Sequence, residues 1–134
     1  TPLPEPELNV GFRRIRLFPR SAVPYNVQSF PSTHTVPPEQ IWVITGGVNL
    51  LIDGMNDLGM VDMSADRIII WTDGRDAQSF NSEIRQSKET PFEIYLEGNI
   101  EIRQGTYYLK ANRAFYDARE GRAVMLDRTQ NASP

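Results

Sequence analysis

Few side chains in this sequence are suited to catalysis or metal binding. The chain has one histidine, His34, and no cysteine, which leaves no thiolate nucleophile and no histidine cluster for a metal ion. A Ser-His-Asp arrangement would have to use His34, which lies in the loop-like stretch PSTHTVPP, and no Gly-x-Ser-x-Gly motif is present. The sequence therefore predicts a protein that is not an enzyme and that uses no cofactor and no metal ion.

Four aspartates could in principle form a calcium site: Asp53, Asp57, Asp62 and Asp66. Their spacing does not follow the Asp-x-Asp-x-Asp-Gly pattern of a calcium-binding loop. We interpret them as the solvated side chains of a hairpin.

A cluster of arginines near the start of the chain raises the question of an anionic ligand: Arg13, Arg14, Arg16 and Arg20. We favour a solvated strand face, because exposed charges are common on such faces. The formal net charge of the whole chain is −3, and this argues against nucleic acid as a partner, since nucleic-acid-binding domains usually carry a basic excess.

Aromatic residues offer a further possibility, because exposed rings can stack on sugars. The same residues favour strands for packing reasons alone. Carbohydrate binding therefore remains an alternative, with these candidates: Trp42, Trp71, Tyr95, Tyr107, Tyr108 and Tyr116.

The elements that must position these residues are strands. From Ile41 onward apolar residues alternate with polar ones, and turn signals such as Asp53-Gly54 and Gln104-Gly105 recur every eight to twelve residues. The pattern predicts an all-β fold of roughly ten to twelve strands, each about five to seven residues long. No apolar run approaches the roughly 20 residues that span a bilayer, so we expect no transmembrane segment.

Proline divides the chain unevenly, since eight of the ten prolines lie in residues 1–40. Proline is excluded from central strands, so we expect a proline-rich arm here, with edge strands at FRRIRLF (12–18) and VPYNVQSF (23–30). Residues 41–128 form the main β-domain, and 129–134 form a tail or linker. We interpret the whole as one domain of a larger protein.

Two stretches of the β-domain repeat one another. Gly46 aligns with Gly98 at an offset of 52, and Ala65-Asp66-Arg67 aligns with Ala111-Asn112-Arg113 at an offset of 46. Repeats that differ in loop length are typical of stacked β units. Glycine tolerates a tight bend and a short Asx side chain bonds its own backbone, so we expect structural corners at these positions: Gly46, Asp66, Gly98, Asn99, Gly105 and Asn112.

The second repeat, EGNIEIRQGTYYLKANRAFYD (97–117), resembles the repeat of the OstA-like, or LptA-like, domains of lipopolysaccharide-transport proteins. The matching residues are Gly98, Asn99, Ile100, Gln104, Gly105, Ala111, Asn112, Ala114, Tyr116 and Asp117. The resemblance covers 92–127 well and 41–71 less well, where Gly47 replaces the asparagine and Trp71 the final aspartate. It does not cover residues 1–40.

The resemblance implies a β-jelly-roll of stacked, bent antiparallel strands, located on the periplasmic side of the cell envelope. Family members hold lipid acyl chains in an apolar groove and stack end to end in outer-membrane assembly. Lipid or lipopolysaccharide and neighbouring β-domains are thus the expected partners. Ile41, Phe92 and the following groove candidates should face inward: Val43, Val48, Leu50, Ile52, Ile68, Ile70, Ile94, Leu96, Ile100, Ile102, Leu109 and Phe115. Alternatively, these side chains fill the space between the faces themselves.

Three functions remain open from the sequence. The first is lipid or lipopolysaccharide handling, which the resemblance and the apolar inner faces favour. The second is a protein-binding module that joins neighbouring domains by strand addition at an exposed edge, without lipid. The third is carbohydrate binding through the surface aromatics.

Overall fold

The structure is a computed structural model that describes residues 12–32, 38–54, 59–73, 83–87, 90, 92–117 and 122–125. Its strands are β1 (Phe12–Pro19), β2 (Asn26–Ser32), β3 (Glu39–Asp53), β4 (Val61–Asp73), β5 (Glu83–Ser87), β6 (Phe92–Gln104), β7 (Tyr107–Asp117) and β8 (Arg122–Met125). The predicted all-β fold is confirmed. His34, Asp57 and the predicted tail at 129–134 lie outside the described residues.

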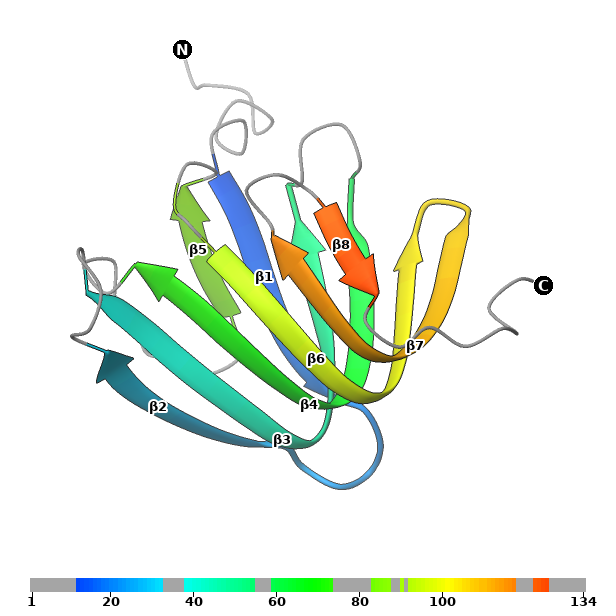
Figure 1. Cartoon of the computed structure of the whole chain (residues 1–134), viewed down its shortest axis with the longest axis horizontal. Helices are drawn as coiled ribbons and strands as arrows, with labels where there is room; N and C mark the ends of the chain where they lie inside the picture. Colours follow the sequence, from blue (N-terminus) through cyan, green and yellow to red (C-terminus); the bar gives the residue numbers. More distant parts are fainter. Residues whose placement is uncertain are drawn as a thin grey trace, which may run out of the picture.

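The strands belong to one antiparallel sheet in the order β5-β1-β3-β4-β6-β7-β8. β1 pairs with the second half of β3, and β2 pairs with its first half. The long strands β3, β4, β6 and β7 bend, so the sheet folds over and its two halves face each other without closing into a barrel (Figure 1). The first arm contains β2, β8 and residues 39–45, 67–73, 92–97 and 114–117. The second arm contains β5, β1 and residues 48–53, 61–64, 100–104 and 107–111.

The strands are longer and fewer than the sequence predicts. The described residues form eight strands rather than ten to twelve, and β3 alone has 15 residues. The prediction is wrong because it treats each glycine corner as the end of a strand. Pairing of β3 with β4 instead resumes directly after the corner, from Thr45 opposite Arg67 to Val48 opposite Ala65. A bulge bends a strand without ending it.

The strands of the proline-rich third cover one side of β3. β2 pairs with residues 39–45 and β1 with residues 48–53. β2 is an edge strand, as predicted, and it contains Pro31, which is tolerated there because proline has no N–H to donate. β1 is not an edge strand, because β5 pairs with its other side. The prediction missed this pairing because β5 comes about 70 residues later in the sequence.

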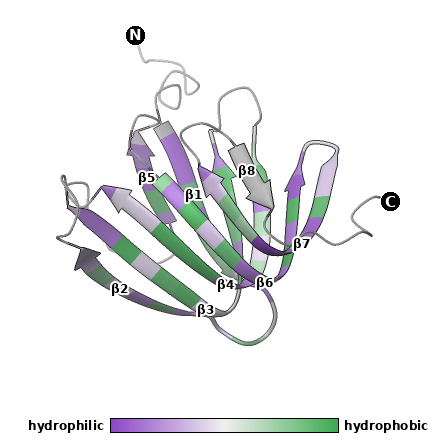
Figure 2. Ribbon diagram, viewed as in Figure 1, coloured by the Kyte–Doolittle hydropathy of each residue, from purple (hydrophilic) through white to green (hydrophobic). Residues whose placement is uncertain are grey.

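The core lies between the inner faces of the two arms. Side chains alternate between the faces of a strand, so only every second residue reaches this core, and Figure 2 shows the corresponding alternation of hydropathy. The buried apolar residues form one cluster with at most 5% exposure: Ile15, Leu17, Trp42, Ile44, Val48, Leu50, Ile52, Val61, Met63, Ala65, Ile68, Ile70, Ile84, Phe92, Ile94, Leu96, Ile100, Ile102, Ala111, Ala114 and Tyr116.

Two kinds of corner bend the long strands. β3 bends at Gly46-Gly47, with φ of 98° and 90°, and β6 bends at Gly98-Asn99, with φ of 85° and 48°. Even-numbered residues face the core on both sides of these two-residue corners. On β4 and β7 a single residue, Asp66 or Asn112, occupies the corner, and the inward residues change there from odd to even numbers.

The change from odd to even inward residues at these corners shows that part of the predicted groove lining is wrong. The prediction is wrong for Ile41, Val43 and Phe115, which face outward. It assumed that the inward residues change from odd to even numbers at the corner of β3 and do not change at the corner of β7. The structure has the opposite arrangement. The residues buried in their place are Trp42, Ile44, Ala114 and Tyr116.

Gly105 is a turn residue rather than a bend within a strand. It has a φ of 60° and lies between β6 and β7, where the sequence predicts a Gln-Gly hairpin. The other predicted corners lie at the bends of the sheet.

Candidate functional site: an open half of strand β7 and its corner

The predicted lipid groove is occupied by its own lining. Leu109 also points inward, opposite Ile102, and is partly exposed on β7. Close packing leaves little free volume for an acyl chain between these described side chains. Nine of the twelve groove candidates are buried in the core: Val48, Leu50, Ile52, Ile68, Ile70, Ile94, Leu96, Ile100 and Ile102.

The aromatic candidates are not gathered on one surface. Trp42 and Tyr116 are each 2% exposed and belong to the core. Trp71 and Tyr95 are half-buried on the outer face of the first arm. On the second arm Tyr107 is exposed, and Tyr108 lies with its ring centroid 4.8 Å from the guanidinium carbon of Arg103.

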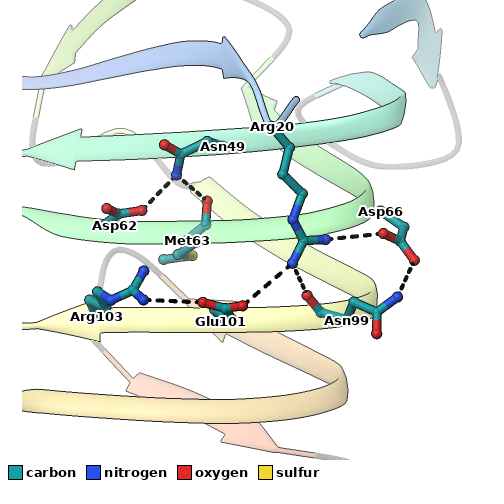
Figure 3. A network of polar contacts seen from close by, with 8 residues as sticks. All are labelled: Arg20, Asn49, Asp62, Met63, Asp66, Asn99, Glu101 and Arg103. Atoms are coloured by element: carbon teal, nitrogen blue, oxygen red, sulfur yellow. Dashed lines mark hydrogen bonds and ion pairs between the residues drawn. The ribbon is translucent and has the colours of Figure 1, made fainter. Parts of the chain in front are cut away.

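The first corner is held by a polar network, which Figure 3 shows from close by. Arg20, in the connection from β1 to β2, donates from Nη1 to Oδ1 of Asp66 at 3.0 Å and from Nη2 to the carbonyl oxygen of Asn99. Its backbone N–H donates to the carbonyl of Gly47 at 3.2 Å. Arg20 thus connects three neighbouring strands at their bends.

Asp66 also ties the first corner to the next strand. The Nδ2 group of Asn99 donates to Oδ2 of Asp66 at 3.0 Å. Gly98 lies directly beside this carboxylate, since a Cβ atom at Gly98 would lie 2.5 Å from Oδ2 of Asp66. Both the positive φ and the lack of space therefore require glycine at position 98.

Within the described residues, the second corner has a neighbouring strand on one side only. Asn112 occupies on β7 the position that Asp66 occupies on β4, and it is exposed. β8 pairs with β7 only at residues 114–117. Residues 107–113 of β7, which we call the open half-edge, pair with β6 and have no second strand beside them within the described chain.

A surface cavity lies at this second corner. It has a volume of about 190 Å³ and is lined by Asn99, Ile100, Glu101, Lys110, Ala111 and Asn112. These residues come from the bends of β6 and β7. The sequence repeat identifies both strands, but it does not show that, within the described residues, β8 covers only 114–117 of β7.

Two other edges of the sheet, β2 and β5, have features that oppose strand addition. β2 contains Pro31, and β5 is only five residues long with exposed Glu83 and Arg85. Proline, short length and charge are the usual means by which edge strands avoid pairing with other chains. Residues 107–113 form the longest proline-free stretch of the described strands that has a described strand on one side only.

A buried polar group lies at the free ends of the arms. Arg13 is 2% exposed and donates from Nε to Oε1 of Gln86 at 3.0 Å, while Gln86 donates to Oγ1 of Thr72 at 3.3 Å. Burial lowers the pKa of Arg13, and the charges of Tyr116 and Asp117 oppose this change. These contacts link strands of both arms.

Of the other candidate aspartates, Asp53 and Asp62 each contact a side chain of a neighbouring strand. Arg14 pairs with Asp53 at 3.1 Å, and Asn49 donates to Asp62 at 2.6 Å. The predicted solvated arginine face is thus wrong for Arg13, which is buried because it points toward the core on β1. In the described ranges no three His, Cys, Asp or Glu side chains come together as ligands for a metal ion.

No helix in the described part of the chain has the length and apolar character needed to span a bilayer. Comparison of the chain with models of protein families, with curated proteins and with solved structures gave no match. The resemblance to OstA-like repeats therefore stays a prediction from the motif.

Proposed function

We propose that this chain is a non-enzymatic module that joins neighbouring β-domains by strand addition at the open half-edge. The observation that carries the proposal is the pairing of residues 107–113, which contact β6 and have no further strand beside them in the described chain. Unpaired N–H and C=O groups of an edge gain hydrogen bonds when a strand is added. The resemblance to OstA-like repeats supports end-to-end stacking and a place on the periplasmic side of the cell envelope.

The side chains of the open half-edge suit a strand like β6. Ile102 lies opposite Met63 of β4 on one side and opposite Leu109 of β7 on the other, so β6 meets both neighbours in equivalent registers. A second strand of this sequence on the free side of β7 repeats these pairs. It places an isoleucine opposite Leu109, and such apolar pairs stabilise sheets.

The filled interior favours this function over lipid holding. A twelve-carbon acyl chain would gain on the order of 10 kcal/mol gross on burial, at roughly 0.8 kcal/mol per methylene. The residues that would contact it already bury one another at 0–5% exposure.

Amide hydrogen exchange, measured by NMR on the full chain, tests the proposal. The probe is a synthetic peptide of residues 97–110, EGNIEIRQGTYYLK, which contains the second half of β6 and can form its own hairpin. We expect added protection at amides of residues 107–113 and unchanged exchange in β2 and β5, because only the open half-edge accepts the strand.

Absence of added protection at 107–113 with a saturating peptide concentration would refute strand addition. A parallel titration with a lipopolysaccharide micelle tests the lipid function. Exchange that accelerates at core residues such as Ile70 and Ile94 would indicate that the arms open around an acyl chain.

A further inference from the structure

We propose that the outer face of the first arm, the side turned away from the core, binds the same face of a second copy of this chain in a two-fold symmetric dimer. The dimer uses a face of the sheet rather than an edge, and it does not depend on the proposed strand addition. The apolar character, the size and the charges of this face favour a second copy as its partner.

A row of apolar side chains crosses the middle of this outer face. Val43, Ile69, Tyr95 and Phe115 lie opposite one another on β3, β4, β6 and β7. All four point away from the core, because the residues on either side of each are buried, and all four are partly exposed. Adjacent strands lie about 4.8 Å apart, so the row forms a continuous apolar band.

The next row toward the tip of the arm, the end away from the corners, widens this band. Ile41 lies opposite Trp71 on one side and opposite Phe30 of β2 on the other. Phe30 is 44% exposed although its side chain is large and apolar. Single exposed apolar residues are common on proteins, but contiguous ones across five strands are typical of a surface that binds another protein.

The outer face of the second arm is polar at the corresponding positions. Its middle row contains three charged side chains: Arg16, Leu51, Asp62, Arg103 and Tyr108. Both outer faces belong to one sheet, so the preference of apolar residues for strands does not explain the difference between them. The apolar band is therefore a property of the first arm.

The face is large enough for a small protein interface. In a sheet each residue covers about 16 Å², from about 3.4 Å along the strand and about 4.8 Å between strands, so the first arm from β2 to β7 presents roughly 500 Å² in outline. Specific interfaces bury from about 600 Å² of accessible surface on each partner, and side chains raise the accessible area above the outline. Two sheets also pack face to face at about 10 Å in β-sandwiches.

The charges of the face are divided between its two ends. The corner end carries Arg67 and Arg113, with Glu97 between them. The tip carries four carboxylates, of which the last three also interact within their own chain: Glu39, Asp73, Glu93 and Asp117. Their charge makes the tip acidic, whereas the corner end has an excess of arginine.

This division favours a second copy and fixes its orientation. A two-fold axis that runs across the strands places the acidic tip of each copy against the arginines of the other, so the same favourable contact forms twice. An axis parallel to the strands places acidic tip against acidic tip, which is repulsive. In the favoured arrangement Ile69 of each copy lies near the axis, and Arg67 approaches the tip of the second copy.

Sedimentation equilibrium of the full chain tests the dimer. The mass of the unchanged protein should approach that of two chains as the concentration rises. Ile69→Lys should weaken the dimer at least tenfold, because it places a charge in the centre of the apolar band. Leu51→Lys is the control, since it adds the same charge at a partly exposed outward position of the second arm and should leave the dimer unchanged.

A charge reversal tests the orientation. Arg67 pairs with Glu97 at 3.3 Å and Arg103 pairs with Glu101 at 3.2 Å, so Arg67→Glu and Arg103→Glu remove equivalent contacts within the chain. Arg67→Glu should weaken the dimer about fivefold, because it places a carboxylate against the acidic tip of the second copy. Arg103→Glu, on the outer face of the second arm, should not weaken it.

The contrary outcomes are as definite. A monomer at every concentration, or a dimer that Leu51→Lys weakens as much as Ile69→Lys, overturns the proposal. Equal effects of the two arginine changes overturn the orientation. If Ile69→Lys loses the β-sheet signal in circular dichroism, Val43→Lys takes its place and adds the charge one strand away. Binding of the 97–110 peptide should be the same in the folded lysine variant as in the unchanged protein, which separates the dimer from strand addition.

Discussion

The two corner layers of this protein have closely similar sequences and different surroundings. In the first layer Asp66 lies between Arg20 on one side and Asn99 on the other. In the second layer Asn112 has β6 on one side and no described strand on the other. The first layer is closed by contacts that come from 46 and 33 residues away in the sequence.

The difference shows that the repeated motif is one half of an interaction. A glycine corner on one strand and an Asx corner on the next form a pair only when they are neighbours in the sheet. A stack of such layers leaves one unmatched corner at its last strand. Substitutions in the closed first layer should therefore cost more stability than comparable substitutions outside it.

Gly98→Val should disrupt the closed first layer. Valine at a φ of 85° is strained, and its Cβ would collide with Asp66, so we expect a loss of about 4 kcal/mol in the free energy of unfolding. Urea denaturation followed by tryptophan fluorescence measures this. Gly105→Ala is the control, because Gly105 has a φ of 60° but open space around it, and it should cost only about 1 kcal/mol.

Arg20→Ala should weaken the first layer by a smaller amount. Its side chain is 23% exposed and contacts Asp66, Asn99 and Glu101, so we expect about 1 kcal/mol of destabilisation. Arg103→Ala removes a more exposed partner of Glu101, 55% exposed, and should cost less than about 0.5 kcal/mol. Equal effects of the two changes in urea denaturation would contradict a special role for Arg20 at the corner.

Tyr116→Phe should have the smallest effect and only at high pH. Burial raises the pKa of Tyr116 to about 12, the charge of Arg13 lowers it and that of Asp117 raises it. An unfolded tyrosine has a pKa near 10, so the stabilisation from protonated Tyr116 is complete below about pH 10 and is lost as the pH rises toward 12. The variant should lose less stability over this interval than the unchanged protein. Parallel stability curves from pH 9 to 12 would contradict the prediction.

Much of the fold follows from local patterns in the sequence. Alternation of apolar and polar residues predicts the strands, and the Gln104-Gly105 turn predicts the hairpin between β6 and β7. The repeat correctly places the bends at Gly46, Gly98 and their Asx counterparts. These features depend on residues close together in the chain, which is why a single sequence contains them.

The phase of the side chains does not follow from the same patterns. Alternation of apolar and polar residues predicts that one face of a strand is buried. A corner of one residue changes which alternate residues point toward the core, whereas a corner of two residues leaves them unchanged. Ile41 and Val43 are as apolar as Trp42 and Ile44, so the sequence pattern does not distinguish the two pairs. Only the pairing across β4 decides which pair enters the core.

Some properties of the candidate site likewise follow from the sequence, and others follow only from the tertiary structure. The sequence by itself determined that Gly98, Asn99 and Asn112 lie at bends, because these residue types adopt or support such conformations locally. Only the tertiary structure decided that Arg20 closes the first corner, that Arg13 is buried, and that β8 pairs with residues 114–117 of β7. The physical reason is that these properties depend on which strands become neighbours, and strand pairing joins residues far apart in the chain.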